Sequence, residues 1–121
     1  MGMNIQTEIE LAVRSALELA VEFFQLNLKE IPILFTIPHY YDAIACLEYT
    51  DGFNAEDCVL MFDLEWAKKN KEVCLTELVP HEVAHYVDRM VYGTAHENEH
   101  GKTWQLIKTH IYALEPKECY G

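Results

Sequence analysis

Residues 77–85 carry the most informative pattern in the chain. They read Glu77-Leu78-Val79-Pro80-His81-Glu82-Val83-Ala84-His85 and contain the motif His-Glu-x-x-His. Four residues advance about 400° along an α-helix, so His81 and His85 project from one face, one turn apart. Two imidazoles at this separation can bind one zinc ion, and Glu82 beside them can reach a metal-bound water. Zinc lowers the pKa of such a water to about 7, and Glu82 would accept its proton as the water attacks a polarised carbonyl. The motif predicts a catalytic zinc site; the alternative is a pair of surface histidines on a helix.

The residues around the motif predict further helices. Apolar residues recur at helical spacing through residues 75–91, which places the motif on a helix. Pro80 lies inside this pattern and removes one backbone donor, so we expect a kink or an irregular first turn. Asp63 or Asn70 can start a short helix before it. A last helix is predicted over residues 101–114, and its apolar face consists of Trp104, Ile107 and Ile111.

The first half of the chain predicts one long helix and a small sheet. Apolar residues at steps of three and four run through residues 5–28, and Pro32 ends the helical option. Residues 33–37, 44–49 and 58–62 are rich in β-branched, aromatic and other apolar side chains and read as short strands. The fold class expected is therefore α+β. It comprises a long N-terminal helix, a small antiparallel sheet of about three strands, the motif helix and a C-terminal helix, in one domain over residues 1–121.

Composition limits the classes of function. The chain has 121 residues, half of them hydrophobic, and a net charge of −11 from 9 basic and 20 acidic residues. This balance argues against direct binding of nucleic acid, which needs clustered Lys and Arg. No apolar run is long enough to span a membrane, and the N-terminus does not resemble a signal peptide. The four cysteines form no C-x-x-C pair, so we expect free thiols and a cytoplasmic protein.

A zinc site needs at least a third protein ligand. The candidates downstream of the motif are His96, Glu97, Glu99 and His100. The metzincin pattern requires a histidine six residues after the second one, and Val91 stands there, so that class is excluded. His100 lies at the entry to the last predicted helix, which can cross the motif helix and point one side chain at the metal. His96 reads more readily as a solvated loop histidine.

Two separated motifs resemble one family. Residues 77–85, followed after a short loop by His100-Gly101-Lys102-Thr103-Trp104, resemble the SprT family of zinc metalloproteases, which includes the protease domain of Spartan. The resemblance covers about residues 62–107. It implies a minimal zincin-like domain in which His81, His85 and His100 hold the zinc ion and Glu82 is the catalytic base.

Two departures from the family pattern limit what the resemblance implies. Family members often continue into a cysteine-rich zinc ribbon, but only Cys119 follows the predicted catalytic helices, so we expect the ribbon to be missing. Members that act on DNA-bound proteins rely on basic segments, whereas this chain is acidic. The resemblance therefore favours zinc and peptide hydrolysis over a DNA-associated substrate, although it allows one.

Several other side chains have an ordinary structural explanation beside a functional one. Asp88 shares the face of His81 and can accept the second N–H of a ligand histidine or form a salt bridge. Tyr86 and Tyr92 can stabilise an oxyanion, but packing is the better explanation. Residues 58–62 form either a cleft rim that pairs with an extended peptide or an ordinary core strand. The remaining residues are interpreted as structural or as packing anchors: His39, His110 and Trp104.

The leading functional hypothesis is a zinc-dependent metallopeptidase acting on a protein or peptide substrate. The alternative is a zinc-binding, non-catalytic module whose acidic surface contacts a partner, and a weaker one is a metal-free acidic inhibitor or DNA mimic. Glu82 favours the enzyme, because a structural zinc site needs no general base. The oligomeric state stays open.

Overall fold

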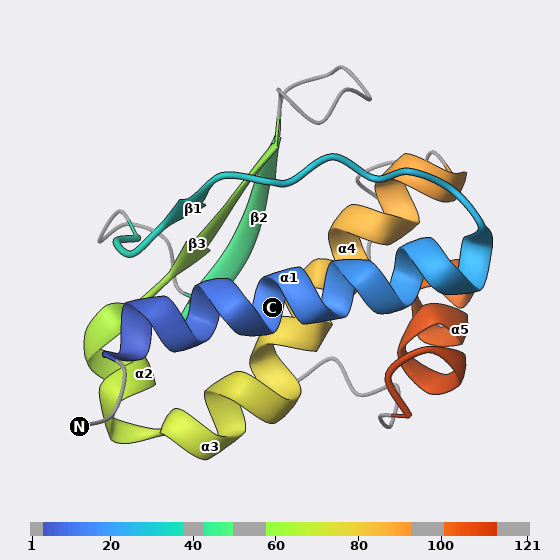
Figure 1. Ribbon diagram of the computed structural model, residues 1–121. Helices are drawn as coiled ribbons and strands as arrows, with labels where there is room; N and C mark the ends of the chain where they lie inside the picture. Colours follow the sequence, from blue (N-terminus) through green and yellow to red (C-terminus); the bar gives the residue numbers. More distant parts are fainter. Residues whose placement is uncertain (1–3, 38–42, 50–57, 93–100, 114–121) are drawn as a thin grey trace.

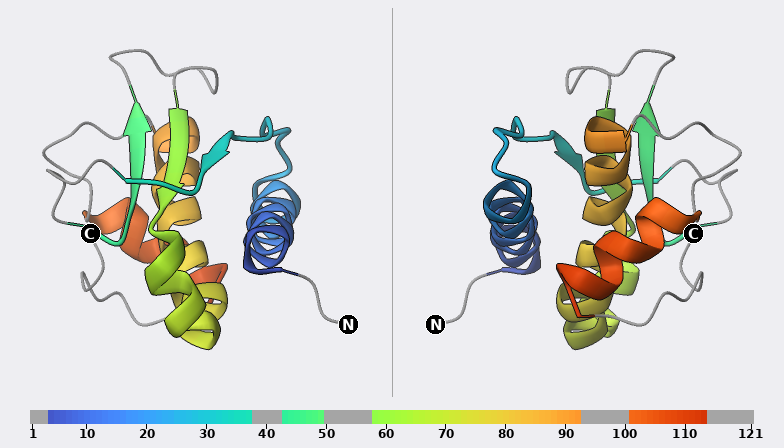
Figure 2. Two further views of the ribbon diagram at one scale, coloured as in Figure 1. Left: turned by 90° about the vertical axis from the view of Figure 1, so that its left-hand side faces the viewer. Right: turned by 90° about the vertical axis from the view of Figure 1, so that its right-hand side faces the viewer.

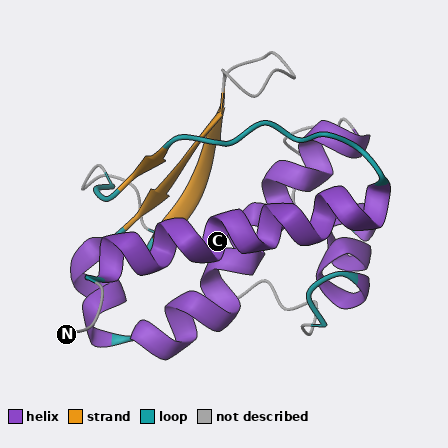
Figure 3. Ribbon diagram, in the orientation of Figure 1, coloured by secondary structure: helices purple, strands orange, loops and turns teal. Residues whose placement is uncertain are grey.

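The computed structural model describes residues 4–37, 43–49, 58–92 and 101–113 (Figure 1). It is an α+β fold with a long first helix, a three-stranded sheet and further helices (Figure 3), as expected from the sequence. The elements are α1 (Ile5–Phe24), β1 (Ile33–Leu34), β2 (Ala45–Tyr49), β3 (Cys58–Phe62), α2 (Leu64–Lys69), α3 (Lys71–Val73), the π-helix η2 (Cys74–Leu78), α4 (Val79–Tyr92) and α5 (Lys102–His110). None of the described helices is long and apolar enough to cross a membrane.

Helix α1 is fixed at both ends by local interactions. The Asn4 side chain accepts a hydrogen bond of 2.9 Å from the backbone N–H of Thr7, which is an N-cap. The helix ends earlier than the periodicity predicts, because Gln25 takes a left-handed conformation with φ of 56°. Its apolar face is buried as predicted: Ile5, Ile9, Val13, Ala16, Leu17 and Ala20.

The sheet is mixed rather than wholly antiparallel. Its strand order is β1-β3-β2, with β2 antiparallel to β3 and β1 parallel to it. The β1–β3 pair therefore differs from the predicted antiparallel sheet, because its two strands run parallel to each other. With both of its edges paired and Cys58, Leu60 and Phe62 buried, β3 is an ordinary core strand and not a cleft rim.

The approach to α4 is irregular, as Pro80 predicts. Asp63 caps α2 by accepting a 3.1 Å hydrogen bond from the Trp66 N–H, and Asn70 precedes α3. The next turn, η2, is π-helical: the Val79 N–H bonds the carbonyl of Cys74, five residues back. This wider turn ends at Leu78, two residues before Pro80, which cannot donate a backbone hydrogen bond and would crowd a regular helix.

Helix α4 occupies the middle of the fold. It contacts α1, α5, β2 and β3. In Figure 2, α1 stands on one side of α4 and the sheet, while α5 crosses α4. Because helices or strands surround α4, most of its side chains are buried, including polar ones. The motif predicted from the sequence is therefore held inside the molecule.

Candidate metal centre

Helix α4 brings the three residues of the His-Glu-x-x-His motif together. His81 and Glu82 are fully buried in its first turns, and His85 lies one turn further and is partly buried. Each residue offers a ligand atom, and these atoms lie within 4.8 Å of one another. The one-turn spacing on a regular α-helix produces this cluster, as the sequence predicts.

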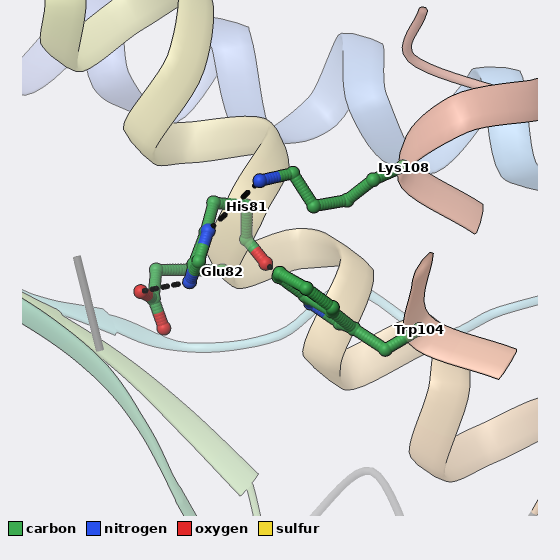
Figure 4. A network of polar contacts seen from close by, with 4 residues as sticks. All are labelled: His81, Glu82, Trp104 and Lys108. Atoms are coloured by element: carbon green, nitrogen blue, oxygen red, sulfur yellow. Dashed lines mark hydrogen bonds and ion pairs between the residues drawn. The ribbon is translucent and has the colours of Figure 1, made fainter. Parts of the chain in front are cut away.

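The two nitrogens of His81 have different surroundings. Nε2 lies 3.8 Å from Oε2 of Glu82, while Nδ1 lies 3.2 Å from Nζ of Lys108 on α5 (Figure 4). Nε2 therefore faces the carboxylate side of the site. Lys108 is almost completely buried, which the sequence did not predict: a lysine near a helix end normally faces solvent.

Trp104 of α5 packs against the rings of both histidines. Its ring meets the His81 ring edge-on, with centroids 4.9 Å apart, and stacks on the His85 ring at 5.1 Å and 17°. The indole Nε1 also donates a 3.4 Å hydrogen bond to the carbonyl oxygen of His81. This geometry is consistent with the interpretation of Trp104 as a packing anchor. The residues that Trp104 packs against are His81 and His85 of the candidate site.

The donor set suits a metal ion such as zinc. Imidazole nitrogens and carboxylate oxygens are among the ligands that zinc takes in proteins, and two histidines one helical turn apart supply two of the usual three. His100, the third ligand expected, lies outside the described residues, as do His96, Glu97 and Glu99. His39 also lies outside them.

The structure also describes three further candidates from the sequence: Asp88, Tyr86 and Tyr92. Asp88 is buried on α4, and its role beside a ligand histidine stays a prediction. Tyr86 donates a 3.0 Å hydrogen bond to the carbonyl of Lys29, so its hydroxyl serves packing between α4 and the segment after α1. Tyr92 is exposed and lies about 16 Å along the helix axis from His81, too far to act there.

Comparison with known proteins places this site in a family. The family model described as SprT-like matches residues 18–119, which is most of the chain and includes the whole motif. The chain belongs to the SprT-like family. Among curated relatives, Protein SprT of Pseudomonas putida (strain GB-1) is 39% identical over 63 residues, covering 52% of this chain and 38% of that protein. Protein SprT of Pseudomonas entomophila (strain L48) is 37% identical over 63 residues, with the same coverage.

The match to the curated SprT proteins covers only part of their length. The chain spans less than two-fifths of the length of the curated relatives that it matches. No solved structure matches it. Family membership thus confirms the resemblance seen in the two motifs, and it supports a metal site without reporting an activity.

Strand β2 adds a residue to this SprT-like site that the sequence did not indicate. The pKa of the Cys46 thiol is raised to about 11, first by burial and then by the negative charges of Glu82 and Glu48. Cys46 is a free thiol, and its neighbour Glu82 lies far away in the sequence. Only the packing of β2 against α4 brings the two together, and no local pattern could have shown it.

Proposed function

We propose that this SprT-like chain is a zinc-dependent metallopeptidase that hydrolyses peptide bonds. His81, His85 and His100 would hold the zinc ion, and Glu82 would act as general base. Two findings support the proposal: family membership, and the clustering of His81, Glu82 and His85 around a common point. Helix α5, which begins at Lys102, packs against α4 and so lies beside the candidate ligands.

The burial of Glu82 is the observation that carries the proposal. A carboxylate with no exposed surface is costly unless it does chemical or electrostatic work, and a purely structural metal site needs no such group. When bound, zinc supplies a Lewis acid that polarises the substrate carbonyl. Glu82 lies 3.8 Å from Nε2 of His81, beside the two imidazoles, where it can take the proton of an attacking water.

The sheet supplies a place for an extended substrate. Within the described residues, β2 pairs with β3 alone, which leaves its other edge unpaired, and β2 also contacts α4. A peptide in an extended conformation can add to such an edge through its backbone, with its carbonyl near the site. The peptide-binding strand that we propose is therefore β2, in place of the buried strand β3.

The proposed partner is a protein or peptide substrate, and the proposed compartment is the cytoplasm. The net charge of −11 disfavours direct binding of DNA, so a DNA-associated substrate would be recognised through its protein part. An acidic surface also favours substrates that carry basic segments.

The test replaces Glu82 by Gln, which keeps the shape of the side chain and removes its basicity. We expect Glu82→Gln to bind zinc like the unmodified protein and to lose about 10²- to 10⁴-fold in peptide hydrolysis, the usual contribution of a general base. Metal content by elemental analysis and cleavage of an unfolded protein substrate measure the two properties. Glu72→Gln is the matched control, because Glu72 is exposed outside the site.

Two results would count against the proposal. Full hydrolysis by Glu82→Gln would exclude Glu82 as the base. A zinc-loaded protein that hydrolyses no peptide in any tested substrate would favour the zinc-binding interaction module instead.

A further inference from the structure

An apolar groove lies at the end of the molecule away from β1, where α1 and α5 both pack against α4 (Figure 1). Its volume is about 150 Å³. Apart from His110, the side chains that line it are apolar: Phe23, Phe24, Tyr92, Leu106, Ile107 and Ile111. An apolar cavity of this size can hold a ring such as benzene. The groove can therefore accept one large apolar side chain of a binding partner.

The walls of the groove are held in place by contacts within the protein. The Phe24 ring meets the Phe23 ring at 5.1 Å and the Tyr92 ring at 6.0 Å, edge-on in both cases. Tyr112 donates a 2.8 Å hydrogen bond to the carbonyl oxygen of Ala16, which ties the segment after α5 to α1. Because the groove exists before a partner arrives, little conformational freedom is lost on binding.

Large apolar side chains around the groove are exposed to solvent. Phe23 is 57% exposed, Tyr92 48% and Leu106 44%. Leu19, one turn before Phe23 on α1, is 49% exposed and extends the patch. Exposed apolar side chains that gather in one patch mark a surface that binds a partner, whereas single ones need no explanation. The one-turn spacing of Leu19 and Phe23 matches the spacing at which a second helix presents its own apolar side chains.

Acidic side chains border this patch along α1. Glu18 and Glu22 are exposed and stand one position before Leu19 and Phe23, which places an acidic row beside the apolar row on the helix surface. No cation among the described residues forms an ion pair with either carboxylate. The whole chain has a net charge of −11. A partner that carries Lys or Arg next to its apolar side chains therefore complements both the groove and its rim.

We propose that this groove docks an amphipathic helix of a partner protein. One large apolar side chain of that helix fills the groove, and basic residues along one edge of the helix face Glu18 and Glu22. Tyr92, which lines the groove, lies about 16 Å from His81 along the axis of α4. The docking surface is thus separate from the candidate metal centre, and the inference does not depend on metal binding or on hydrolysis.

The experiment measures the binding of a fluorescently labelled, 18-residue model peptide by fluorescence anisotropy. The peptide contains leucine and phenylalanine on one helical face and lysine along its edges. We expect Phe23→Gln and Leu106→Gln to weaken its binding about 10-fold or more, as the loss of an interface anchor does. Glutamine is a good helix former, so the helices should persist. The matched control is Leu11→Gln, which should bind like the unmodified protein, because Leu11 is 40% exposed on α1 outside the groove.

A pair of double variants tests the acidic rim. Glu18→Gln with Glu22→Gln should weaken binding about 2- to 10-fold, the effect of losing two exposed ion pairs. Glu72→Gln with Glu77→Gln changes the net charge equally at exposed positions outside the groove and should have no effect. Equal losses in the two double variants would show attraction by net charge alone and would overturn the proposal.

A version of the peptide with proline at its centre tests the helical form of the partner. Proline in a helix interior breaks the helix, so this peptide should bind about 10-fold more weakly or less well still. Equal binding of the two peptides would overturn the proposal of a helical partner.

The remaining controls separate this groove from the metal centre and from self-association. Metal-free and zinc-loaded protein should bind the peptide equally; binding only with zinc would place the peptide at the metal centre and overturn the proposal. Absence of binding to the folded, unmodified protein, or equal binding by Phe23→Gln and Leu106→Gln, would also overturn it. A dimer in sedimentation velocity that Leu106→Gln dissociates would assign the groove to a second copy of this chain instead.

Discussion

At the scale of single residues, Trp104 connects the site to the rest of the fold. Its indole contacts the rings of His81 and His85 and donates a hydrogen bond to the backbone carbonyl oxygen of His81, although Trp104 belongs to a different helix. One buried side chain thereby restrains the rotation of two candidate ligands. A metal site whose ligands are held in this way needs little rearrangement when the ion binds.

Cys74 provides a residue-scale prediction about pH. It is buried in η2, and burial raises the pKa of its thiol from 9.0 to about 11. The unfolded chain thus releases this proton at lower pH than the folded protein does, so the free energy of unfolding falls as the pH rises from about 9 to 11. Below pH 9 both states keep the proton and the contribution is complete.

The measurement is urea unfolding at several pH values between 8 and 11, with Cys74→Ala beside the unmodified protein. The variant should lose part of the alkaline fall in stability while remaining less stable at pH 8 because of the cavity. An identical pH slope in both proteins would show that Cys74 does not contribute to it.

At the scale of elements, α1 illustrates how an amphipathic helix is stabilised. Its buried face packs against α4, and its outer face carries charged residues. Ile9 is completely buried, whereas Leu11 on the same helix is 40% exposed. The two positions differ in burial and share their helix, which makes them a matched pair.

Ile9→Ala should lower the free energy of unfolding by about 2–5 kcal/mol, because it removes buried methyl and methylene groups and leaves a cavity. Leu11→Ala should change it by less than about 0.5 kcal/mol, since alanine is a good helix former and little apolar surface is lost. Chemical denaturation of both variants measures the difference. Equal losses at the two positions would contradict the packing of α1 described here.

The sequence predicted elements better than it predicted their pairing. Helical periodicity identified α1 and α4, and Asp63, Asn70 and Pro80 marked the irregular region between β3 and α4. The end of α1 and the order of the strands were not predictable, because a left-handed residue at Gln25 and a parallel β1–β3 pair leave no periodic signal. Strand register depends on contacts between segments that lie far apart in the chain.

The same distinction applies to the candidate site. The spacing of His81 and His85 on one helix is local, so the motif predicted their proximity. Cys46 and Lys108 approach the site only because β2 and α5 pack against α4, and a sequence without a fold does not contain that information.

At the scale of the whole molecule, a metal ion would link α4 with the segment that leads into α5. A ligand that binds only the folded state stabilises it, by about 2.7 kcal/mol at a concentration of one hundred times its Kd. For a domain of 121 residues this corresponds to an increase in Tm of roughly 10 °C. We therefore expect zinc to raise the Tm of the metal-free protein by about this amount, and a chelator to reverse it.

Variants of the downstream histidines make this prediction specific to the proposed ligand set. His100→Ala should lose most of the increase in Tm, because two histidines from one helical turn bind zinc far more weakly than three ligands do. His96→Ala should keep it. Differential scanning fluorimetry with and without zinc distinguishes the two variants. If His96→Ala lost the stabilisation and His100→Ala kept it, the third ligand would be His96, and the metal would join α4 to a different point of the chain before α5.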